Sequence, residues 1–133
     1  MNPIAEYLKL LAEKEPGMFE IYIYGDTEYV GFKILEKRKS FGYDDDAPLY
    51  EWLTQDACDE IAAAMGYVLN ISVAYPKVGE QCAVYGGYEC AEDFAGIPFG
   101  HQAKDIFAVP AAKRAVAIET LCAAIAHKHG EPK

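Results

Sequence analysis

The long alanine-rich stretch near the end of the chain most restricts what this sequence can fold into. Residues 109–128 read VPAAKRAVAIETLCAAIAHK, and alanine has the best intrinsic helix propensity. Pro110 suits a first helical turn and Gly130 suits a helix end, so the stretch predicts one long helix over 109–128. A helix with so broad an apolar face has to be covered, and we expect the earlier parts of the chain to pack around it.

Hydrophobic residues at helical spacing predict two shorter helices earlier in the chain. The first covers residues 2–12 and ends before Pro16. The second begins at Thr54 or Asp56, either of which can cap a helix, and stops at Gly66.

Runs of β-branched and aromatic residues predict two β-hairpins. Residues 18–24 pair with 28–35, and residues 67–75 pair with 80–85. In the first hairpin, Val30, Phe32 and Ile34 form the better core face.

Two segments lack periodicity, and they complete the predicted order of elements. Residues 40–49 read as turns, and residues 88–107 read as a long loop of the kind that often carries function. The resulting order α-β-β-α-β-β-α predicts an α+β fold. We expect a four-stranded, mainly antiparallel sheet packed by helices, with the long C-terminal helix central.

Chain length and hydropathy narrow the class of protein. A chain of 133 residues suits one domain, spanning 1–133. No apolar run reaches the ~20 residues of a membrane span, and the first residues lack the basic start of a signal peptide, so we expect a cytoplasmic protein. The cysteines fit no zinc or redox motif, and we expect free thiols at Cys58, Cys82, Cys90 and Cys122.

The net charge of −9 is concentrated in the middle of the chain. Residues 1–39 hold seven acids and six bases, and residues 104–133 hold three acids and five bases. Residues 40–103 hold eleven acids and one base, Lys77, for a net of −10. Such a surface repels nucleic acids and anionic membranes and attracts a basic protein surface.

Seven acids fall within seventeen positions that contain no base: Asp44, Asp45, Asp46, Glu51, Asp56, Asp59 and Glu60. Their order does not match the calcium-loop pattern Asp-x-Asp-x-Asp-Gly. A run of like charges is most often a solvated surface. The alternative is a recognition surface that presents carboxylates to a basic partner and imitates a phosphate backbone. The interleaved Tyr43, Tyr50 and Trp52 favour this alternative, because aromatic residues are enriched at binding hot spots.

The sequence holds no catalytic or cofactor motif. Its glycines form neither a dinucleotide-binding nor a phosphate-binding loop. His127 and His129 are two positions apart and diverge on a helix, so we expect no metal site. One catalytic or ligand-binding alternative stays open in the 88–107 segment, around Cys90, Asp93 and His101.

Two stretches resemble a family of small phage proteins with the alpha-beta-alpha sandwich domain. WLTQDA at 52–57, running into IAAAMGY at 61–67, looks like the family's Asp-Ala-x(n)-Gly helix start. VPAAKRAVA at 109–117 resembles its closing Ala-Ala-x-Arg-Ala helix. The resemblance covers about residues 45–128, and EWLT stands at 51–54 in place of the family's Asn-Pro-rich start.

This resemblance implies a phage or prophage origin and no enzymatic activity, and it supplies no site residues. A small acidic phage protein also resembles anti-defence inhibitors, among them anti-CRISPR proteins.

We therefore expect a non-enzymatic, phage-encoded acidic protein in the host cytoplasm that binds and inhibits a host defence protein. Its partner is a basic surface, such as that of a nucleic-acid-binding protein, with no direct contact to nucleic acid or membrane and no cofactor. The predicted binding face consists of Asp44, Asp45, Asp46, Tyr50, Glu51, Trp52, Asp56, Asp59 and Glu60. A homodimer also stays open among the partners. A third interpretation, a homo-oligomeric structural protein, stays open as well, and an uncovered apolar or tyrosine-rich sheet face would favour it.

Overall fold

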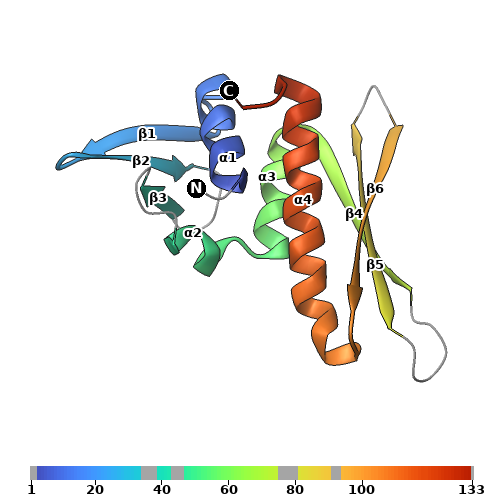
Figure 1. The fold of residues 1–133 in the computed structure, drawn as a ribbon. Coiled ribbons are helices and arrows are strands. Elements are labelled where there is room, and N and C mark those ends of the chain that lie inside the picture. Colours follow the sequence, from blue (N-terminus) through green and yellow to red (C-terminus); the bar gives the residue numbers. More distant parts are fainter. Residues whose placement is uncertain (1–2, 34–38, 43–46, 75–80, 91–93, 133) are drawn as a thin grey trace.

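The computed structural model describes residues 3–33, 39–42, 47–74, 81–90 and 94–132 (Figure 1). Three strands follow the first helix, and three more follow a pair of helices. The elements in chain order are α1 (Pro3–Lys14), β1 (Phe19–Tyr24), β2 (Thr27–Phe32), β3 (Lys39–Gly42), α2 (Ala47–Trp52), α3 (Gln55–Ala64), β4 (Tyr67–Ala74), β5 (Cys82–Cys90), β6 (Phe94–Ala103), the 3₁₀ turn η1 (Ile106–Ala108) and α4 (Val109–His129).

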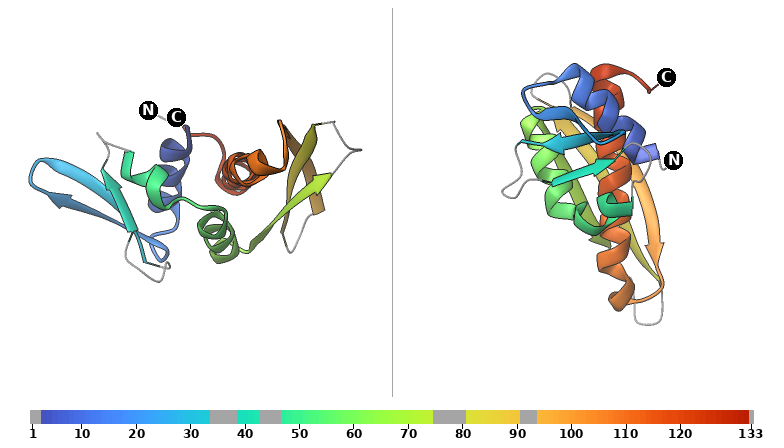
Figure 2. Two further views of the ribbon diagram at one scale, coloured as in Figure 1. Left: turned by 90° about the horizontal axis from the view of Figure 1, so that it is seen from below. Right: turned by 90° about the vertical axis from the view of Figure 1, so that its left-hand side faces the viewer.

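Two antiparallel three-stranded sheets enclose a layer of helices. The strand orders are β1-β2-β3 and β4-β5-β6. Figures 1 and 2 show α1, α3 and α4 between the sheets. The long helix α4 contacts α1, α3 and all three strands of the second sheet. The predicted α+β class and the central C-terminal helix are confirmed, whereas the single four-stranded sheet was wrong.

The predicted first hairpin is confirmed as β1 and β2. The two strands pair from Phe19↔Phe32 to Tyr24↔Thr27 around a two-residue turn. Gly25, the first turn residue, has φ +64°, which is typical of a type II′ turn. Val30 and Phe32 are buried, as the alternation along β2 predicts.

The 88–107 segment is not a loop. β5 continues through Gly86 and Gly87 to Cys90, and most of the remaining segment forms β6. The strand predicted over residues 80–85 is therefore longer than expected, and β6 pairs with β5 from Glu89↔Phe94 to Cys82↔Ala103. The turn-rich 40–49 segment likewise contains residues of β3 and α2.

The main core lies between α4 and the elements on both sides of it. Its fully buried side chains include Leu8 of α1, Phe32 of β2, Ile61 of α3 and Leu121 of α4. All four cysteines carry free thiols. Among the described residues, no helix combines the length and the apolar character that a membrane crossing requires.

Candidate functional site

Helix α3 places three of the predicted acids on its outward side. It begins after Thr54, whose Oγ1 accepts a hydrogen bond from the Ala57 backbone N–H at 3.2 Å. This cap confirms Thr54 as the helix start and fixes the rotation of the helix. The side chains of Ala57, Cys58, Ile61 and Ala62 are buried against the core. Asp56, Asp59 and Glu60, spaced by three and four residues, therefore lie together on the other side.

The described acids of the predicted binding face differ in exposure. Glu51 on α2 and Asp56 and Glu60 on α3 are exposed, and Asp59 is half-buried. Asp44, Asp45 and Asp46 lie outside the described residues, as does the side chain of Tyr50.

Trp52 belongs to the predicted binding face, but its side chain is half-buried against the rest of the protein. Its ring meets that of Phe32 edge to face, with the ring centroids 4.7 Å apart. Its indole Nε1 donates a hydrogen bond to the Ser40 carbonyl at 3.4 Å. These contacts fasten α2 to the first sheet, so the structure gives Trp52 a packing role.

Among the described acids of the predicted binding face, Asp59 has the surroundings that least favour a charged carboxylate. Its Oδ1 is buried and has no hydrogen-bond partner in the described part of the protein. Burial raises the pKa of this carboxyl, the charge of Asp56 raises it further, and Lys113 of α4 opposes both effects. A buried carboxylate oxygen without a donor destabilises the fold.

Two bases of α4 lie against this acidic segment, although the sequence from 44 to 60 contains none. The Arg114 Nε donates a hydrogen bond to the Leu53 carbonyl at 2.8 Å, between α2 and α3. Lys113 is close enough to Asp59 for its positive charge to oppose the rise in the pKa of that carboxyl. Sequence reasoning missed both contacts, because a separation of about sixty positions leaves no local signal.

The alternative site around Cys90, Asp93 and His101 is not assembled from the residues that the structure describes. Cys90 ends β5, whereas His101 pairs with Val84 at the other end of that strand. Six residues of strand separate the two positions by roughly 20 Å. The His101 Nε2 instead lies 2.8 Å from Glu119 Oε1 on α4. Asp93 lies outside the described residues.

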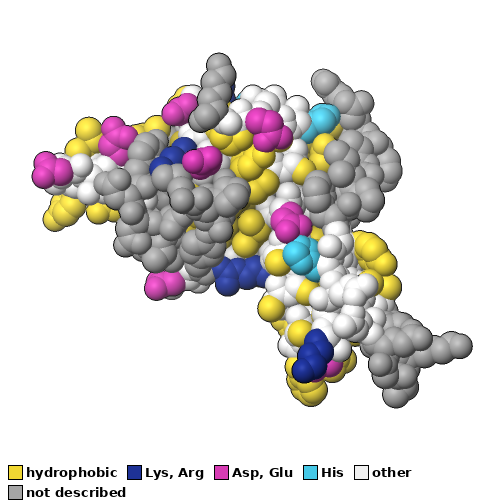
Figure 3. Space-filling view, in the orientation of Figure 1, with side chains coloured by type: hydrophobic (Ala, Val, Ile, Leu, Met, Phe, Trp, Pro, Cys, Tyr) yellow, Lys and Arg dark blue, Asp and Glu magenta, His cyan; other side chains and the backbone are white. Residues whose placement is uncertain are grey.

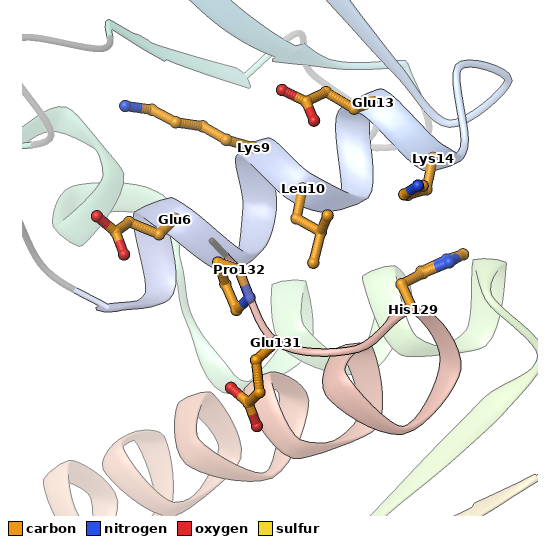
Figure 4. Close-up of a pocket in the computed structure, with 8 residues that line it drawn as sticks. All are labelled: Glu6, Lys9, Leu10, Glu13, Lys14, His129, Glu131 and Pro132. Carbon is orange, nitrogen blue, oxygen red and sulfur yellow. The ribbon is translucent and has the colours of Figure 1, made fainter.

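A cleft of about 510 Å³ lies between α1 and the C-terminal segment. Its lining consists of Glu6, Lys9, Leu10, Glu13, Lys14, His129, Glu131 and Pro132. Figure 4 shows Leu10 and Pro132 facing the gap, whereas Lys9 and Glu13 point away from it. Because these charged groups diverge, the cleft lacks the convergent polar groups of a ligand site. Among the described residues, no cluster of His, Cys, Asp or Glu is placed to hold a metal.

The histidines next to this cleft make structural contacts. The His129 Nε2 lies 2.6 Å from Glu15 Oε2, and the Lys128 Nζ donates to Glu15 Oε1 at 2.9 Å. The His127 Nδ1 shares a hydrogen bond of 2.6 Å with the hydroxyl of Tyr67, a buried residue. These contacts join the end of α4 to the end of α1 and to the start of β4.

Comparison with models of protein families, with curated proteins and with solved structures found no match to this chain. The resemblance to phage proteins with the alpha-beta-alpha sandwich domain therefore stays a prediction.

Proposed function

We propose that this protein is a non-enzymatic inhibitor that places an acidic face on a basic surface of another protein and blocks it. The acidic face comprises the acids on α2 and α3 together with the Asp44–Asp46 run. The observation that carries the proposal lies on α3, where Asp56 and Glu60 are both exposed on the side of the helix that faces away from the core.

The exposed carboxylates of Asp56 and Glu60 support a protein partner, because both are accessible to its side chains. Charge-assisted hydrogen bonds from Lys or Arg to a carboxylate are the stronger kind. The surrounding negative field would also speed the encounter with a basic surface.

The distribution of charge along the chain supports a partner with a basic surface. Residues 40–103 carry a net charge of −10, and the acidic face lies within this segment. A basic surface that ordinarily binds nucleic acid would accept such a face in place of phosphates. The phage resemblance would make this partner a host defence protein.

A capture experiment with paired variants tests the proposal. The wild-type protein, Asp56→Asn/Glu60→Gln and the control Asp26→Asn/Glu28→Gln are immobilised and exposed to a bacterial lysate. Both pairs remove two exposed acids, and the control pair lies on the β1–β2 hairpin. We expect one protein to be retained by wild type and control and lost by the α3 variant. Equal retention by all three would remove the proposal.

A further inference from the structure

Strand β1 stands at the edge of the first sheet. The order β1-β2-β3 leaves one side of β1 without a strand in the part of the chain that the structure describes. Its sequence, FEIYIY, has no lysine, proline or glycine and one charged residue, Glu20. Proteins usually protect an exposed edge with lysine, proline, a bulge or a covering element. Glu20 is the one charged side chain of this strand, and the sequence has neither the lysine nor the proline that commonly protects an edge.

The hairpin geometry shows which backbone groups point out of that edge. In a two-residue hairpin the residues next to the turn, Tyr24 and Thr27, form a hydrogen-bonded pair. The bond of 2.9 Å from the Lys33 N–H to the Met18 carbonyl agrees with this phase. Hydrogen bonding alternates along an antiparallel pair, so the backbone groups of Ile21 and Ile23 point away from β2.

The rest of the protein covers the apolar face of β1 only at the start of the strand. Phe19, Ile21 and Ile23 share one face, and their exposure rises from 1% to 43% and then 70%. Figure 1 shows the hairpin projecting past the helices, and Figure 3 shows hydrophobic side chains at its far end, on the left. Both the open edge and the uncovered face therefore belong to one short segment.

We propose that β1 pairs antiparallel with β1 of a second copy about a two-fold axis at position 22, which joins the two sheets into one of six strands. In this register Ile21 lies opposite Ile23 of the second copy, and the two exchange both backbone hydrogen bonds. The isoleucines of both copies fall on the same face of the joined sheet and form one apolar row.

A second copy fits this edge, because the two-fold register sets the exposed Ile21 against the exposed Ile23 and keeps like charges apart. Glu20 lies opposite Tyr24 of the second copy, so no two carboxylates face each other although the chain carries a net charge of −9. A two-fold pairing uses the same edge of both copies and closes on itself, which gives a dimer and no filament. This dimer is separate from the binding function proposed for α2 and α3.

The first test measures mass in solution. We expect sedimentation equilibrium of the wild type to give twice the mass of one chain at high concentration. Ile23→Pro removes an N–H that points out of the edge and is not bonded to β2, so the hairpin tolerates it while pairing is blocked. We expect this variant to stay a monomer with an unchanged circular dichroism spectrum. A monomeric wild type, or an equally dimeric Ile23→Pro, would overturn the proposal.

A cross-linking pair tests the register itself. Residues at position 22 of two copies would form a directly opposed, non-hydrogen-bonded pair, with Cα atoms about 4.5 Å apart, within disulfide range. Mild oxidation of Tyr22→Cys should give a reducible covalent dimer. Tyr24→Cys, which faces position 20 of the second copy, should give no more than the wild type with its four native cysteines. Equal cross-linking of the two variants would exclude this register.

Discussion

Gly86 of β5 lies directly against Thr120 of α4. A Cβ at Gly86 would come within 2.4 Å of Thr120 Oγ1 and 2.5 Å of Val116 Cγ1. Thr120 is fully buried, and its hydroxyl donates to the Val116 carbonyl at 2.7 Å, so neither neighbour has room to move. This glycine therefore sets how closely the central helix approaches the second sheet.

Gly86→Ala should lower the free energy of unfolding by about 1–3 kcal/mol, the usual cost of overpacking a tight core. Urea unfolding followed by circular dichroism measures it. Gly100→Ala on β6 is the matched control, because its Cβ would meet its nearest neighbour at an ordinary 3.6 Å. Equal midpoints for Gly86→Ala and the wild type would mean that α4 does not pack as closely as described.

The contact between the ends of α1 and α4 should make stability depend on pH. Partial burial opposes ionisation of Glu15, but hydrogen bonds from His129 and Lys128 outweigh it and lower the pKa below its usual 4.5. A lowered carboxyl pKa stabilises the fold above the unfolded value, and this stabilisation is lost as the pH falls through the folded value.

Glu15→Gln should therefore cost about 1 kcal/mol at pH 7, because it weakens hydrogen bonds to a charged group. This difference from the wild type should shrink as the pH falls below the folded pKa of Glu15. Urea titrations at neutral and acidic pH measure both values. Glu13→Gln, at an exposed position in the last turn of α1, should match the wild type throughout. A penalty for Glu15→Gln that does not change with pH would contradict the ion-pair account.

Asp59→Asn should change stability and binding in opposite directions. Burial raises the pKa of Asp59, as does the nearby charge of Asp56, so the ionised carboxylate destabilises the fold at neutral pH. The neutral amide of Asp59→Asn should raise the unfolding midpoint slightly at pH 7. At acidic pH the midpoints of the variant and the wild type should differ less, because the Asp59 carboxyl of the wild type is then protonated and neutral as well. Retention of the captured partner should fall. A variant that is more stable and binds equally well would show that Asp59 lies outside the interface.

Neutralising the acidic run should weaken binding in a way that depends on salt. Asp44→Asn/Asp45→Asn/Asp46→Asn removes three charges from the segment of highest acidic density. We expect lower affinity at low salt and a flatter decline of affinity as salt is added, because fewer charges are left to screen. Binding assays at two salt concentrations measure this. Unchanged affinity at both would mean that the run is only a solvated surface.

Local sequence patterns were enough to predict the elements whose signals are local. The β1–β2 hairpin follows from alternation around Gly25, α3 follows from the Thr54 cap, and α4 follows from an alanine-rich stretch between Pro110 and Gly130. In each case the residues that form the element also mark its ends.

The remaining parts depend on contacts between distant residues. Gly86 lies inside β5, beyond the predicted strand end at residue 85, and its lack of a side chain allows α4 to approach closely. The 88–107 segment reads as a loop, yet most of it forms β6, and its Pro98 falls at an irregularity in the pairing with β5, where a missing N–H is tolerated. The two three-stranded sheets could not be distinguished from one sheet, because strand order leaves no local pattern. Arg114 and Lys113 are distant from the acidic helices in the sequence and come close to them only in the folded protein.

The most direct test of the acidic-face account is the salt dependence of the binding constant for the captured partner. It is measured for the wild type, Asp56→Asn/Glu60→Gln and Asp26→Asn/Glu28→Gln, from low salt to ~0.5 M, where the Debye length is several-fold shorter. The account predicts a steep loss of affinity with salt for the wild type and the hairpin control, and a weaker, flatter response for the α3 variant. Three superimposable curves would contradict it.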